Sequence, residues 1–108
     1  MKIENPGFIA TEDILWLQAD GTEVLIQAAI GVPYRRPNAW ACPTALAGVD
    51  RRYSDIVGES SMQSLNLAIR LIRQRLGHLL DKGEILVHPH DRTSHWTLAA
   101  LDAVFGRV

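Results

Sequence analysis

Cysteine is nearly absent from this sequence, because Cys42 is the single thiol among 108 residues. One cysteine excludes an internal disulfide framework and any metal site made only of cysteines. Charge of one sign is also lacking, since eleven lysines and arginines face twelve aspartates and glutamates, which gives a formal net charge of −1. A near-neutral chain is not a polybasic protein held on nucleic acid by bulk charge, so we expect no nucleic-acid partner.

Long apolar runs are missing as well. The longest candidate, residues 24–32, is interrupted by Gln27 and stops at Pro33, whereas a membrane-spanning helix needs roughly 18 apolar residues. Residues 1–6 carry one basic residue followed by an acid and a proline, which is not the pattern of a secretory signal. The lone thiol agrees with a reducing compartment. These features predict a cytoplasmic protein with no membrane association.

The first half of the chain has the pattern of β-strands. Asp20-Gly21 separates two β-rich runs, residues 14–18 and 22–30, and this dipeptide favours a tight hairpin turn. Residues 31–38 hold two prolines and read as a loop. Further strands are expected around 40–46, with Pro43 at an edge or a bulge, and at 51–57. We therefore predict about four antiparallel strands within residues 8–57.

The second half has the pattern of helices. Ser60 and Gln63 fit a capping box, and apolar residues at helical spacing follow it, which predicts a helix over about 61–80 with one face on the sheet. The stripe consists of Met62, Leu65, Ala68, Ile69, Ile72 and Leu76. A short strand at 84–90 and a C-terminal helix capped by Thr93 or Ser94 come next. The sequence thus predicts a single α+β domain over residues 1–108, with an antiparallel sheet packed on one long helix.

Part of the chain resembles a known family. Trp40-Ala41-Cys42-Pro43 is followed by Gly58, Ser61, Gln63-Ser64-Leu65 and Leu67-Ala68. This pattern resembles a family of small uncharacterised bacterial proteins, a domain of unknown function. The resemblance covers about a third of the chain and implies a bacterial protein with a sheet followed by a long helix. It implies no catalytic residue.

Histidines near the end of the chain form a candidate metal site. In an extended segment His88 and His90 project from one face about 7 Å apart, a spacing that two ligands of one metal can use. His95 or Asp91 can supply a third ligand and leave a position open for water, as in catalytic zinc sites. The alternative is a solvated loop before a helix cap, and we expect no cofactor.

Arginines and the cysteine are weaker candidates. An anion or partner surface can be built from Arg51, Arg52, Arg70 and Arg73. Neither a glycine-rich phosphate cradle nor an RNA-binding aromatic signature accompanies them, so solvated charge is the alternative. Cys42 lies on a predicted strand with no base nearby in the sequence, and we expect it to act as a small buried hydrophobe.

Surplus apolar surface is the feature that suggests a function. Leu15 and Leu17 face away from the strand side that the long helix can cover, and Leu67 and Leu71 face away from the main helix stripe. The C-terminal helix can cover one of these surfaces, and residues 1–13 can fold back over the other. Uncovered patches of this kind mark interaction sites. We therefore expect a non-enzymatic module that binds another protein or forms a homodimer, with a small metal-dependent enzyme as the alternative.

Overall fold

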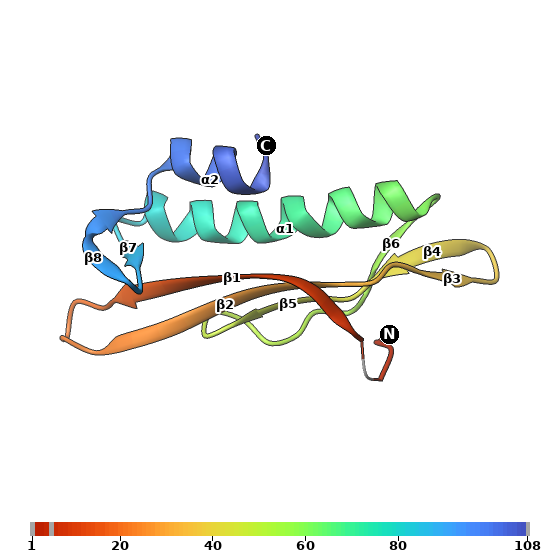
Figure 1. The fold of residues 1–108 in the computed structure, drawn as a ribbon, viewed down its shortest axis with the longest axis horizontal. Coiled ribbons are helices and arrows are strands. Elements are labelled where there is room, and N and C mark those ends of the chain that lie inside the picture. Colours follow the sequence, from red (N-terminus) through yellow and green to blue (C-terminus); the bar gives the residue numbers. More distant parts are fainter. Residues whose placement is uncertain (1, 5, 108) are drawn as a thin grey trace.

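The computed structural model describes residues 2–4 and 6–107. Within them the chain forms two helices and eight strands, arranged as two antiparallel sheets with both helices on the same side of the larger sheet (Figure 1). In chain order the elements are β1 Phe8–Leu17, β2 Glu23–Gly31, β3 Tyr34–Arg36, β4 Ala39–Cys42, β5 Thr44–Ala47, β6 Ile56–Gly58, α1 Ser61–Asp81, β7 Ile85–His88, β8 Asp91–His95 and α2 Leu98–Phe105. The predicted α+β class is confirmed.

The larger sheet, sheet A, has the strand order β5-β2-β1-β7-β8. Its centre is the predicted hairpin: β1 and β2 pair with Ile14 opposite Ile26, and Gly21 takes a φ of 88° in the turn. The Asp20 carboxylate accepts the Thr22 N–H at 2.8 Å, which closes the turn. Both isoleucines are fully buried beneath α1. The Asp-Gly signal therefore gave the correct hairpin.

The smaller sheet, sheet B, has the order β3-β4-β6 and corrects the predicted strands. The strand expected around 40–46 is two strands in different sheets, because Pro43 has no N–H to donate between β4 and β5. The Pro43 carbonyl instead accepts the Gly31 N–H at 2.9 Å. The loop expected at 31–38 contains β3, and the strand expected at 51–57 shrinks to β6. The predicted single sheet of about four strands is therefore wrong in number, because the chain forms one sheet of five strands and one of three.

Helix α1 begins where the capping pattern predicts. The Ser60 hydroxyl accepts the Gln63 N–H at 3.0 Å, and the Gln63 side chain accepts the Glu59 N–H at 2.6 Å. Ile72 and Leu76 are fully buried against sheet A. Met62, the first residue of the predicted stripe, is 76% exposed and does not belong to the core. None of the described helices is long and apolar enough to cross a membrane.

Helix α2 starts later than predicted. Residues 91–95 form strand β8, so Thr97 caps the helix and accepts the Ala100 N–H at 3.1 Å, in place of Thr93 or Ser94. Arg73 of α1 pairs with Asp102 of α2 at 2.9 Å and fixes the two helices side by side. Leu101 and Trp96 complete the core from this end of the chain.

Candidate functional site

The predicted histidine site is only partly assembled. The rings of His88 and His90 lie 5.4 Å apart, at the turn between β7 and β8, and His88 stacks on Trp96 at 4.5 Å. Asp91 accepts from Thr93, through both the backbone N–H and the hydroxyl, and these bonds hold its pKa below the usual value. His95, the last residue of β8, is opposite Val87, and a register shift separates this pair from the His88–Asp91 pair. Within residues 2–4 and 6–107, no group of three or more histidine, cysteine, aspartate or glutamate side chains is placed to hold a metal ion.

Two of the four predicted anion-binding arginines form ion pairs within the chain. Arg52 pairs with the buried Asp55 at 3.0 Å, and Arg73 pairs with Asp102 between the helices. Asp55 also accepts the Tyr34 hydroxyl at 2.6 Å, so Arg52 belongs to a tether that holds sheet B together. Arg51 lies on the loop before β6 and Arg70 on α1, both exposed. Two of the four guanidinium groups are therefore committed to structural ion pairs.

Cys42 is fully buried at the end of β4. Burial raises the pKa of its thiol to about 11, and the nearby Asp55 carboxylate acts in the same direction. A nucleophilic cysteine needs the opposite shift and access to solvent. The thiol therefore has the environment of a packing group.

The two predicted self-association pairs lie on different surfaces. Leu15 and Leu17 alternate with the core residues Ile14 and Trp16, so they occupy the face of sheet A that points away from both helices (Figure 1). Leu67 is 37% exposed on α1, and Leu71 is half-buried one turn further along the same helix. The pairs cannot form one continuous patch, because the sheet separates them.

The face of sheet A that carries Leu15 and Leu17, here called the outer face, is apolar and partly exposed, although Val87 on the same face is fully buried. Leu15 lies between Leu25 on β2 and Val87 on β7, and Leu17 lies between Glu23 and Ile85. Leu25 is 56% exposed and Ile85 is 44% exposed. Among the described residues before β1, Ile3 is held beside sheet B, where its N–H donates to Asp55 at 2.8 Å.

One carboxylate on the outer face is neutralised by an ion pair within the chain, and another accepts a hydrogen bond there. Arg92 in the β7–β8 hairpin reaches Glu23 at the start of β2 and forms a two-point ion pair with it. The Asp13 carboxylate accepts the Gln27 side-chain N–H at 3.1 Å. The outer face therefore presents leucine and isoleucine side chains beside an ion-paired Glu23 and an Asp13 that is hydrogen-bonded to the uncharged Gln27.

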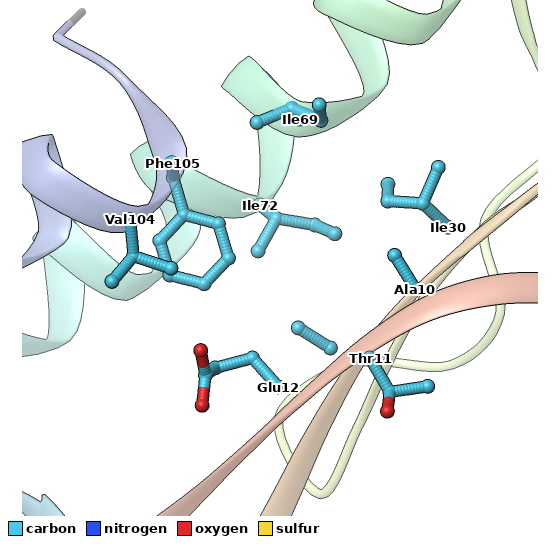
Figure 2. Close-up of a pocket in the computed structure, with 9 residues that line it drawn as sticks. Ala10, Thr11, Glu12, Ile30, Ile69, Ile72, Val104 and Phe105 are labelled. Atoms are coloured by element: carbon cyan, nitrogen blue, oxygen red, sulfur yellow. The ribbon is translucent and has the colours of Figure 1, made fainter.

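A groove between α1 and β1 was not predicted from the sequence. It lies beneath α2, between the two helices and strands β1 and β2, and has a volume of about 150 Å³. There Phe105 and Ile72 face Ala10 and Glu12 of β1, and Thr11 points to the other side of the strand (Figure 2). The groove is mostly apolar and lies on the helix side of β1 and β2.

The edge of β1 that faces away from β2 is open over half of its length. Strand β7 pairs with β1 only from Leu15 to Leu17. The Leu86 carbonyl accepts the Trp96 N–H and therefore points towards β8. Because main-chain groups alternate along a strand, those of Ile85 and Val87 face β1. The groups of their partners Leu17 and Leu15 face β7 in return.

The main-chain groups of a strand alternate between its two edges with a period of two residues, so Thr11 and Asp13 face the same edge as Leu15 and Leu17. Their main-chain N–H and C=O groups face the side where β7 has ended. The pairing with β2 gives the same alternation. The Gly31 N–H points to Pro43, so the main-chain groups of Ile30 face β1 and pair with Ala10. Among the described residues, no strand pairs with Thr11 or Asp13 on the edge of β1 that faces away from β2.

No family model, curated protein or solved structure matches this chain. The resemblance to a bacterial family therefore stays a prediction. The sequence did contain a signal for the outer face, in the two-sided apolar pattern of residues 14–17. It contained none for the open edge, which depends on where β7 ends.

Proposed function

We propose that this protein is a non-enzymatic interaction module whose copies pair through the outer face of sheet A to form a two-fold dimer. The observation that carries the proposal is the apolar row of Leu25, Leu15, Leu17 and Ile85, in which Leu15 and Leu17 are half-buried and the two end residues are exposed. Two of these large apolar side chains are about half exposed, 56% for Leu25 and 44% for Ile85. Surfaces of this kind are typical of interaction sites.

The charge pattern favours a second copy as the partner. Glu23 is paired with Arg92, so this carboxylate is already neutralised when an identical face approaches. Stacked sheets pack about 10 Å apart with interdigitating side chains. A self-complementary patch of this type closes under two-fold symmetry, which gives a dimer and no larger assembly.

The cellular setting is part of the same proposal. A buried, unpaired thiol such as that of Cys42 is typical of proteins kept in a reducing compartment. The pattern from Trp40 to Ala68 resembles a bacterial family of unknown function. We accordingly place the module in a bacterial cytoplasm, acting without a cofactor.

Sedimentation velocity over a wide dilution series tests this function. We expect the apparent mass to rise with concentration from that of one chain, 12.0 kDa, to twice that value. The mass should stop there, because two-fold pairing uses the same face on both copies. A species that stays at the mass of one chain up to high micromolar concentration would contradict the proposal.

A further inference from the structure

The open edge of β1 and the groove beside it form a second surface, separate from the outer face. The edge offers the main-chain groups of Thr11 and Asp13, which face away from β2. The groove lies on the helix side of the same residues, where Ala10 and Glu12 face Ile69 and Phe105 (Figure 2). An exposed edge of this kind pairs readily with another extended chain.

The combination matches one mode of peptide recognition. When an extended peptide adds a strand to a sheet edge, main-chain hydrogen bonds supply affinity and pockets for alternate side chains supply specificity. Here an added strand would bond to Thr11 and Asp13, and every second side chain would enter the groove. All strand pairs of sheet A are antiparallel, so the added strand continues that pattern.

The charge of the edge selects the partner. Residues 1–34 hold five acidic residues and one lysine, and two of those acids lie on the open stretch. Glu12 lines the groove and makes no ion pair among the described residues, and Asp13 is exposed on the opposite face. Cross-strand pairs of opposite charge stabilise a sheet. A basic side chain opposite Glu12 therefore complements this edge.

A second copy fits the edge poorly. In an antiparallel two-fold pairing centred on Thr11, residue 12 of each strand is opposite residue 10 of the other. The two Glu12 side chains then become diagonal neighbours on one face, about 7–8 Å apart. Centring the pair on Glu12 places the two Glu12 side chains directly opposite each other, which increases their repulsion. Like charges at these positions destabilise the pair.

We propose that the open edge of β1 takes up an extended segment of another protein as an added antiparallel strand, with apolar side chains in the groove and a basic residue opposite Glu12. The site is independent of the dimer proposed above, since it uses the edge of the strand and the helix side of sheet A. One chain can therefore pair with its copy and hold a partner segment at the same time.

A short designed peptide is the probe. Its sequence is Thr-Lys-Thr-Val-Thr-Val-Thr, blocked at both ends, which places lysine opposite Glu12 and one valine opposite Ala10. The control peptide has glutamate in place of lysine. Titration of the ¹⁵N-labelled full chain, followed by amide hydrogen exchange, should show slower exchange at Thr11 and Asp13 when the lysine peptide binds. The lysine peptide should bind about tenfold more tightly, as expected when a cross-strand pair changes from repulsive to attractive.

Two variants separate strand addition from general attraction. Thr11→Pro removes an N–H that faces the open edge and leaves the pairing with β2 in place, so it should abolish peptide binding. Thr11→Val keeps that N–H and should bind as the wild type does. Glu12→Lys should reverse the preference, so that the glutamate peptide binds more tightly than the lysine peptide.

The proposal fails if neither peptide alters the Thr11 and Asp13 amides at millimolar concentration. It also fails if Thr11→Pro binds as well as Thr11→Val, or if Glu12→Lys leaves the preference unchanged. Slower exchange at Thr11 and Asp13 on concentrating the free protein would assign the edge to a second copy and overturn the proposed partner.

Discussion

Replacing Ile72 by alanine tests which side of α1 forms the core. Ile72 is fully buried among residues of sheet A and α1. Truncating a buried isoleucine removes its transfer free energy and leaves a cavity, at a cost of about 2–5 kcal/mol. Ile72 also borders the hollow beneath α2, where Phe105 can shift into the vacated space. We therefore expect a loss of about 3 kcal/mol, in the lower half of that range.

Leu67→Ala is the matched control on the same helix. Leu67 is 37% exposed and lies outside the core cluster, so the substitution removes less buried surface. Its expected cost is about 1 kcal/mol. The two substitutions change helix propensity by similar amounts, because leucine and isoleucine differ by only about 0.2 kcal/mol on the propensity scale.

Urea unfolding, followed by tryptophan fluorescence and far-ultraviolet circular dichroism, measures both losses. With a slope of about 1.5 kcal/mol per molar urea, Ile72→Ala should lower the midpoint by about 2 M and Leu67→Ala by less than about 1 M. All samples are kept at one low protein concentration, so that self-association contributes equally. Equal losses, or a larger loss for Leu67→Ala, would mean that the assignment of the helix faces is wrong.

Three further outcomes follow from individual residues. The Arg75 guanidinium donates to Asp50 at 2.7 Å and holds its pKa below the usual value; Asp50→Asn should therefore lower stability at pH 7, and the deficit in urea unfolding should disappear as the pH falls below about 4, where the unfolded carboxyl protonates. The Cys42 thiol, fully buried and with a pKa raised to about 11, should react with a thiol reagent at pH 8 only as fast as the protein unfolds; rapid reaction of the folded protein would refute its burial. Protein purified without a histidine tag should contain no stoichiometric metal, whereas zinc, manganese or iron lost on His88→Ala would favour a metal-dependent enzyme.

Local signals predicted the elements that local chemistry controls. Asp20-Gly21 fixed the β1–β2 hairpin because glycine adopts the positive φ that the turn requires. Ser60 fixed the start of α1 because its hydroxyl accepts a helix N–H that otherwise lacks a partner. Both depend on residues within a few positions of one another.

The errors arose where distant segments decide the outcome. Pro43 divides one expected strand between two sheets, and the sheet that each half joins depends on β2 and β6. Residues 91–95 have the composition of a loop, and they form a strand because β7 offers them an edge. The groove needs α1, α2 and β1 together. The spacing of apolar residues along the chain predicts local structure, and it does not predict contacts between distant segments.

Sedimentation velocity of two matched variants tests the proposed self-association most directly. Leu25 is 56% exposed on the outer face, so Leu25→Glu should leave the fold of one chain intact. In a two-fold dimer the substitution occurs on both sides of the interface, and losing two half-buried leucines should raise the dissociation constant at least about 30-fold. Leu67→Glu, on α1 away from that face, should dimerise as the wild type does. A dimer that survives Leu25→Glu but dissociates with Leu67→Glu would contradict the outer face as the interface.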